Sequence, residues 1–205
     1  MEDRLLRIVH AAMNRRAFLL GSLGAVAATA AASEFAIGEG HALAVTFTSD
    51  VDIFNFALTL EHLENRAYRD AVASGKLTGA NLNYARTFGA QENEHVQIVS
   101  MAITQAGGTP VKEQAKYNFP AFTDEATIID FLRTLEETGV GAYTGASPYV
   151  RSPANLAMAG GILQVEARHT AILRRQNGKA PTPGPLESVL TPDQTLAKAA
   201  PILGS

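Results

Sequence analysis

Apolar residues recur along the chain at alternating three- and four-residue steps, the spacing that places them on one face of an α-helix. Four stretches show this pattern, and each is bounded by residues that start or stop helices. They begin near Asp52, Ala80, Thr123 and Ser152, and they end near Ser74, Ala106, Gly145 and Gln176. Nothing in the pattern reads as a sheet, so it predicts an all-α fold.

The connections between these stretches predict how the helices pair. Gly75 and Gly79 mark a short turn between the first two helices. A polar, proline-containing stretch over residues 111–122 then separates the second helix from the third, and it is long enough to cross from one helix pair to the other. Two helical hairpins joined by a long crossover are the elements of a four-helix bundle.

Acidic residues interrupt the apolar face of every predicted helix. These glutamates are Glu61, Glu92, Glu136 and Glu166, and the second and fourth helices add His95 and His169 three residues later. Glu-x-x-His on a helix aims a carboxylate and an imidazole at one point, a ligand pair that suits a divalent metal. Chance gives this spacing at about one histidine in fifteen. It occurs at two of the three histidines beyond the N-terminal region, which indicates a site.

The two halves of the predicted bundle repeat one another. Glu61 and Tyr68 in the first helix are spaced like Glu136 and Tyr143 in the third, and each pair lies within a Leu-Glu and Ala-Tyr context. The Glu-x-x-His glutamates follow Glu61 and Glu136 by 31 and 30 residues (92 − 61 and 166 − 136). The chain therefore has the form of a degenerate internal repeat of one helical hairpin.

Buried carboxylates need a counter-charge, because burying each one alone costs several kcal/mol. Two divalent cations would balance four glutamates, and this is the main physical reason to expect two metal ions. In the alternative, the glutamates turn to solvent or pair along helix surfaces. Glu64 and Glu137 can each replace a predicted ligand or stand as a solvated surface charge, and the surface reading is favoured.

Composition narrows the chemistry further. The chain has 205 residues, a formal net charge of −3 and a pI near 5.9, with no basic stripe that would indicate nucleic acid or an anionic membrane as a partner. There is no cysteine, which excludes disulfides, iron–sulfur clusters, thiolate zinc sites and a cysteine nucleophile. The side-chain ligands of any bound metal must therefore come from Glu, Asp and His residues.

The N-terminal region carries the features of an export signal. Arg15 and Arg16 precede a weakly apolar, Ala- and Gly-rich run to about Ala32, the pattern of a twin-arginine signal. The run is shorter and less apolar than a membrane-spanning helix requires. We therefore expect residues 1–44 to be a signal peptide with its cleavage region, and the mature protein to be periplasmic or extracellular without a membrane span. An uncleaved anchor or an internal helix is the alternative, and Met13 can be the true start.

The remaining chain divides into two parts. Residues 45–178 contain the predicted bundle, and residues 179–205 form a proline-rich, extended tail with room for a short helix from Asp193 to Ala200.

With these motifs in place, the chain from about Asp52 to Asn177 resembles the ferritin-like superfamily, in which such helices hold two iron or manganese ions. More narrowly, it looks like the exported ferritin-like group that includes desiccation-related proteins. The resemblance implies terminal ligands at Glu61 and Glu136, bridging carboxylates at Glu92 and Glu166, and one imidazole per metal from His95 and His169. It also implies that Tyr68 and Tyr143 donate to ligand carboxylates, although both can simply fill the core.

The function expected from this resemblance is oxidation of ferrous iron or reduction of dioxygen or peroxide at a di-metal centre, with iron favoured over manganese. Ferroxidase, peroxidase and catalase chemistry all use this scaffold, so the fold does not choose among them, and whether the chain is an enzyme stays open. The alternative is a non-catalytic metal-binding or stress-protective protein. A pocket open to small molecules beside the metals would favour the enzyme, and a sealed site the structural role. A homo-oligomer is compatible with either.

Overall fold

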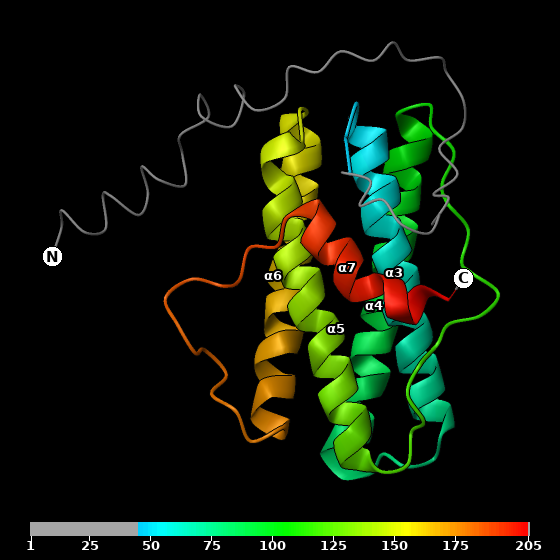
Figure 1. The fold of residues 1–205 in the computed structure, drawn as a ribbon, viewed down its shortest axis with the longest axis vertical. Coiled ribbons are helices and arrows are strands. Elements are labelled where there is room, and N and C mark those ends of the chain that lie inside the picture. Colours follow the sequence, from blue (N-terminus) through cyan, green and yellow to red (C-terminus); the bar gives the residue numbers. More distant parts are fainter. Residues whose placement is uncertain (1–44, 205) are drawn as a thin grey trace, which may run out of the picture. The chain divides into compact units, whose positions relative to one another are not determined.

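The computed structural model describes residues 45–204, and the predicted signal and cleavage region lies outside them. The described chain folds into five α-helices and one 3₁₀ turn, and it contains no strand (Figure 1). The helices are α3 (Asp50–Ala73), α4 (Gly79–Gln105), α5 (Glu125–Ala146), α6 (Pro153–Gln176) and α7 (Pro192–Leu203), and the turn is η1 (Ser147–Tyr149). None of these helices has both the length and the hydropathy to cross a bilayer. The expected all-α fold is confirmed.

Four of the helices form the expected bundle. α3 packs along α4 and α5 packs along α6, and the two hairpins meet where α3 contacts α5 and α4 contacts α6. The crossover after α4 runs along the length of the bundle before α5 begins (Figure 1). The prediction of two helical hairpins joined by a long crossover is therefore confirmed.

Side-chain caps mark the start of every described α-helix except α4. Ser49 accepts a hydrogen bond from the backbone N–H of Asp52, whose carboxylate accepts one from Ser49 N–H in return. This reciprocal cap starts α3 two residues before the predicted position. Asp124 caps α5 and Ser152 caps α6 in the same way, each accepting from a backbone N–H three residues later.

The crossover is more tightly bound to the bundle than its polar composition suggests. Asn55 of α3 donates to the carbonyl of Thr109 and accepts from the N–H of Val111. The Nε2 of His62, on the next turn but one of α3, donates to the Val111 carbonyl. Tyr117, farther along the crossover, is buried in the main core cluster. The crossover therefore covers one face of α3 rather than looping away from it.

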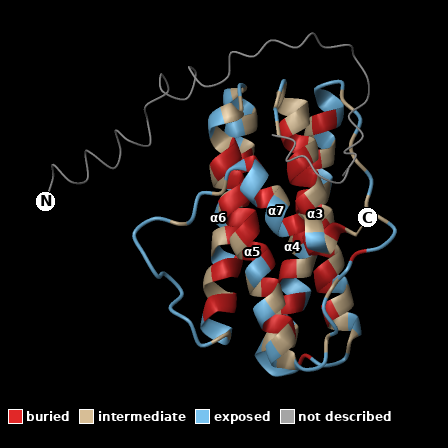
Figure 2. Cartoon of the chain, in the orientation of Figure 1, coloured by how far each residue is buried: buried red, intermediate tan, exposed pale blue. Residues whose placement is uncertain are grey.

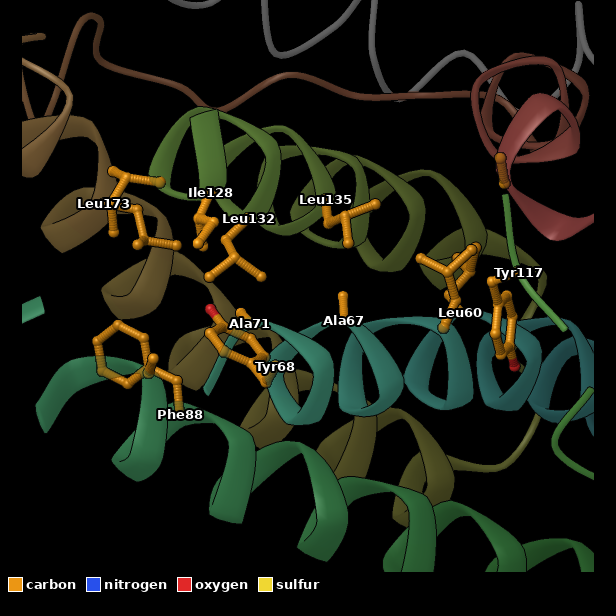
Figure 3. Packing of buried hydrophobic residues seen from close by; sticks show 14 of the residues in the cluster. Leu60, Ala67, Tyr68, Ala71, Phe88, Tyr117, Ile128, Leu132, Leu135 and Leu173 are labelled. Carbon is orange, nitrogen blue, oxygen red and sulfur yellow. The ribbon is translucent and has the colours of Figure 1, made fainter. Parts of the chain in front are cut away.

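The apolar core is divided into two clusters with the candidate site between them. On α4, Phe88 belongs to the larger cluster and Val99 to the smaller, whereas Glu92 lies between. On α6, Ile162 and Leu173 flank the site in the same way. Figure 3 shows part of the larger cluster, including Phe88 and Leu173, and Figure 2 shows that buried residues follow the inward faces of the helices. Apolar side chains therefore close the bundle on both sides of the site.

The C-terminal segment folds back onto the bundle. The N–H of Leu190 donates to the carbonyl of Gly141 at 3.0 Å, and the Leu190 backbone crosses α5 at Gly145, where a side chain would collide with it. The helix that follows, α7, buries Ala199 and Leu203 and packs against α5. It is longer than the predicted 193–200 helix, and the proline-rich segment before it returns to the bundle.

Candidate metal centre

All six predicted ligand residues converge in the interior of the bundle. The four glutamates Glu61, Glu92, Glu136 and Glu166 have no solvent exposure, and His95 and His169 are 5% and 1% exposed. α3 and α5 contribute one glutamate each, and α4 and α6 contribute one glutamate and one histidine each, all on the inward faces that the periodicity predicts. The alternative in which these acids turn to solvent or pair along helix surfaces is therefore wrong.

The first half of the centre is gathered around His95. Its Nδ1 lies 3.4 Å from Oε2 of Glu61, 3.2 Å from Oε2 of Glu92 and 3.1 Å from Oε1 of Glu166. One atom from each of these four residues falls within 4.8 Å of the others, close enough to coordinate one ion. Three carboxylates and one imidazole are a donor set that suits iron, manganese or zinc.

The second half is gathered around His169. Its Nδ1 lies 3.0 Å from Oε1 of Glu92 and 3.1 Å from Oε1 of Glu136. With Glu166, these residues form another group whose ligand atoms lie within 4.8 Å of one another. Glu92 and Glu166 belong to both groups, so two adjacent ions in this arrangement would share them. The two imidazole rings are 6.5 Å apart between centroids.

Burial and mutual repulsion shift the ionisation of the acids. Burial, reinforced by the charge of Glu166, raises the pKa of Glu92 to about 7. Burial and the charge of Glu136 hold the pKa of Glu166 well above its usual range. Burial opposes the charged imidazolium, but Glu136 and Glu92 outweigh it and raise the pKa of His169 to about 10. In the metal-free protein, bound protons therefore neutralise carboxylate charge that metal cations can also neutralise.

The donor set fits divalent cations on a second ground. Two carboxylate oxygens of the centre, Glu136 Oε2 and Glu166 Oε2, are buried without a hydrogen-bond donor. Three more, Glu61 Oε2, Glu92 Oε1 and Glu166 Oε1, have only a histidine Nδ1 within 3.4 Å. No arginine or lysine in residues 45–204 forms an ion pair with these carboxylates. Leaving buried acceptors unsatisfied costs free energy, and metal coordination removes that cost. The buried Glu and His groups can therefore hold metal ions.

The two tyrosines bind carboxylates crosswise between the hairpins. The hydroxyl of Tyr68 on α3 donates to Oε1 of Glu136 on α5 at 2.5 Å, and the hydroxyl of Tyr143 on α5 donates to Oε1 of Glu61 on α3. Both rings are buried, so they also fill the core. Each tyrosine occupies one oxygen of its carboxylate and leaves the other, Oε2, directed elsewhere.

Two residues that the motifs did not single out shape the second half of the centre. Gln91 accepts a hydrogen bond from Nε2 of His169 at 2.7 Å, and Phe88 stacks on the same imidazole with 4.0 Å between centroids. A proton held on Nε2 leaves Nδ1 of the neutral ring free to coordinate a metal. The residue that corresponds to Gln91 in the internal repeat is Val165, so the repeat gave no reason to predict a role for Gln91.

Glu64 is the main correction to the sequence-based interpretation. It is 2% exposed, not a solvated surface charge, and its Oε2 has no hydrogen-bond partner. A Cβ built on Gly139 would lie 2.8 Å from Oε1 of Glu64 and 2.9 Å from Oε2 of Glu166, so the two carboxylates are neighbours across this glycine. Burial, and then the charge of Glu166, raises the pKa of Glu64 well above its usual range.

Glu137 lies outside the centre. It is partly buried and forms ion pairs with Arg133 at 2.5 Å and Arg174 at 2.8 Å. Arg174 also binds Glu187, in the segment that leads back to α7. Glu137 therefore helps to hold the C-terminal segment rather than replacing Glu136, and it is not a free surface charge.

A comparison with known families agrees with this architecture. The family model described as a ferritin-like domain matches residues 49–179, which span all four helices of the bundle and all six candidate ligands. No curated protein matches the chain.

Proposed function

Because the chain belongs to the ferritin-like family, we propose that its bundle binds two divalent metal ions, iron ahead of manganese, and uses them to reduce dioxygen or peroxide. The observation that carries this proposal is the pair of ligand groups that share Glu92 and Glu166. Two ions that share carboxylates lie close enough to act on one small molecule together.

The proposed ligand roles follow the two groups. Glu61 and His95 would bind one ion, Glu136 and His169 the other, and Glu92 and Glu166 both. This is a balanced set, because two divalent charges offset the four carboxylates. When bound, a pair of redox-active ions supplies electrons to an oxidant, or accepts them from ferrous iron.

The chain's own residues would keep this centre in shape. Tyr68 and Tyr143 restrain one oxygen each of Glu136 and Glu61, which would leave the second oxygen of each carboxylate available to an ion. Gln91 holds the ring of His169 from the opposite side. The two apolar clusters that flank the site limit water, which strengthens electrostatic interactions inside it.

Export by the twin-arginine route is part of the proposal. The paired Arg15 and Arg16 support it, and this route carries proteins that are already folded. A metal centre filled inside the cell could then leave with the chain. N-terminal sequencing of the protein recovered outside the cytoplasm tests this: a start between residues 33 and 45 supports export, and a start at Met1 or Met13 contradicts signal removal.

A non-catalytic role is the second candidate, because the four ligand glutamates have no solvent exposure at all. In that role the ions would serve folding only, as structural metals do. The protein would then bind metal stoichiometrically but would not change the oxidation state of iron when given dioxygen or peroxide.

Elemental analysis of protein purified from its native compartment without added metal tests the proposal. We expect close to two equivalents of iron or manganese per chain, and loss of that stoichiometry in a Glu92→Ala, Glu166→Ala double variant. Anaerobic loading with ferrous iron, followed by dioxygen or peroxide, then separates the catalytic from the structural role. A folded protein without metal, or a double variant that keeps two metals, would contradict the proposal.

A further inference from the structure

A cavity of about 110 Å³ lies beside the centre, between α3, α5 and α7. Its wall includes Leu63 and Glu64 from α3, Thr138 and Gly139 from α5, and Ala199 and Ile202 from α7. The volume is sufficient for several water-sized molecules. Figure 1 shows α7 lying across α5, so the C-terminal helix forms the outer side of this space.

The inner end of the cavity is acidic. Glu64 lines the cavity, is 2% exposed, and has one oxygen, Oε2, without a hydrogen-bond donor. Its other oxygen lies across Gly139 from the carboxylate of Glu166, a candidate ligand of both ions. Glu64 therefore lies between the cavity and Glu166, and it forms no ion pair within residues 45–204, although Lys198 of α7 lines the same cavity.

This arrangement is not required by the bundle itself. In the internal repeat, Glu64 of α3 corresponds to Gly139 of α5 (64 + 75 = 139, as 61 + 75 = 136). One half of the bundle thus carries a buried acid where the other half carries no side chain, and the glycine provides the room the acid needs. Burying an unsatisfied acceptor costs free energy. An apolar residue at position 64 would fill the same room without that cost.

We propose that this cavity holds hydrogen peroxide on its way to the two-metal centre, and that the carboxyl of Glu64 accepts a hydrogen bond from it. The inference rests on the proposed function and names its oxidant. Peroxide is small, neutral and a hydrogen-bond donor, so it fits both the largely apolar wall and the acceptor at its inner end. Dioxygen has no hydrogen to donate, so it forms no hydrogen bond with Glu64. Water also donates hydrogen bonds, and it is the molecule that peroxide would displace from the cavity.

Blocking the cavity tests whether it is the path. Ala199→Leu enlarges a side chain in the cavity wall, and Ala197→Leu makes the same change on an exposed position of α7. In stopped-flow mixing with the ferrous-loaded protein, we expect Ala199→Leu to slow oxidation by peroxide at least tenfold. Ala197→Leu should react like the parent, and both should keep two metals. If α7 detaches in Ala199→Leu, Thr138→Leu blocks the same space from α5. Unchanged rates in a folded blocking variant would overturn the proposal.

Changing Glu64 tests the choice of oxidant. Glu64→Leu removes the acceptor, so oxidation by peroxide should slow about tenfold while oxidation by dioxygen keeps its rate. Glu64→Gln retains a carbonyl acceptor of the same size and should recover most of the peroxide rate. Equal slowing with both oxidants, or with neither, would contradict a role for Glu64 in holding peroxide.

Metal-free crystals give a readout that does not depend on redox activity. After a soak in hydrogen peroxide, the parent protein should show peroxide within hydrogen-bond distance of Oε2 of Glu64, and Glu64→Leu should not. If the protein binds no metal but peroxide is found in the cavity, the proposed function is wrong and the peroxide site stands. If the protein binds two metals but no peroxide is found at Glu64, the peroxide site is wrong and the proposed function stands.

Discussion

Tyr68 on α3 donates a 2.5 Å hydrogen bond to Oε1 of Glu136 on α5, so the first hairpin orients a carboxylate of the second. The hydroxyl of Tyr143 on α5 donates in turn to Glu61 on α3, so the second hairpin orients a carboxylate of the first. Each hairpin therefore restrains a carboxylate of the other. The orientation of Glu61 and Glu136 therefore depends on the packing of both hairpins.

Tyr68→Phe should weaken both the metal-free fold and metal binding. The variant leaves Oε1 of the buried Glu136 without its donor hydroxyl, which costs about 1–3 kcal/mol of unfolding free energy. It also frees a proposed ligand to rotate, and loss of such a restraint lowers metal affinity about 10- to 100-fold. Urea unfolding of the metal-free protein and competitive metal titration measure the two effects.

Tyr84→Phe is the matched control for this prediction. Tyr84 lies on α4 and stacks on Phe88, with its ring partly buried, but it has no hydrogen bond to the carboxylates of the centre. We expect little change in either measurement. Equal effects of the two substitutions would mean that the hydroxyl of Tyr68 does not restrain Glu136.

The metal-free protein should lose stability as the pH rises from about 5 to 10. Burial and Glu166 raise the folded-state pKa of Glu92 from 4.5 to about 7, so the folded chain keeps a proton that the unfolded chain releases in this window. Against the effect of burial, Glu136 raises the pKa of His169 from 6.5 to about 10, with the same sign. Because the folded state binds more protons, unfolding free energy falls with pH. Thermal unfolding at pH 5, 7 and 9 measures it.

Two variants of that experiment identify its source. Glu92→Gln removes one of the titrating groups, so stability should fall less steeply between pH 4.5 and 7. Saturating metal should reverse the trend, because ions replace the protons and bind more tightly as the ligands deprotonate. A metal-free protein that becomes more stable from pH 5 to 7 would contradict the shifted ionisation of the buried acids.

Gly139→Ala should destabilise the protein, although a helical Gly→Ala change normally stabilises. The new Cβ would lie less than 3 Å from carboxylate oxygens of both Glu64 and Glu166, so both carboxylates must shift. We expect a loss of about 1–3 kcal/mol in unfolding free energy. Gly160→Ala on α6 meets nothing within 4 Å and should instead gain up to about 1 kcal/mol. Adding Glu64→Ala to Gly139→Ala should recover part of the loss, and a purely additive double variant would contradict the contact.

Gly145→Ala should loosen the C-terminal segment from the bundle. A Cβ at this position would overlap the backbone carbonyl of Leu190, which cannot move without displacing the chain that leads into α7. Amide hydrogen exchange over residues 190–203 should become faster, while exchange in α4 should not change. Gly161→Ala, which meets nothing within 4 Å, is the control. Unchanged exchange near α7 would show that this crossing tolerates a side chain.

Local pattern was sufficient to predict the helices and their inward faces. The apolar stripe that contains Phe88 and Val99 also contains Glu92, so periodicity alone predicted that this acid turns inward. Ser49 and Ser152 act as caps through bonds to backbone groups three residues away, and such bonds can be predicted from neighbouring residues. The start of α3 was predicted two residues late because several polar residues there can serve as caps.

Glu64 shows why a local pattern was not sufficient for the rest of the site. In α3 it lies one turn from Glu61, at a position where the sequence permits either a ligand or a surface charge. Its burial depends on the missing side chain of Gly139 in α5 and on the cover that α7 provides. Gly139 and α7 are both distant from Glu64 in sequence, so no local pattern could predict its environment.

The sequence by itself determined that helices would form, which faces would be buried, and that glutamates and histidines would meet, because each depends on the period of one helix and on a repeated motif. The tertiary structure decided which carboxylate each tyrosine binds, that Gln91 holds His169, and that α7 closes a cavity over Glu64. The physical reason is that hydrogen bonds and packing act over a few ångströms between atoms whose proximity only the assembled bundle creates.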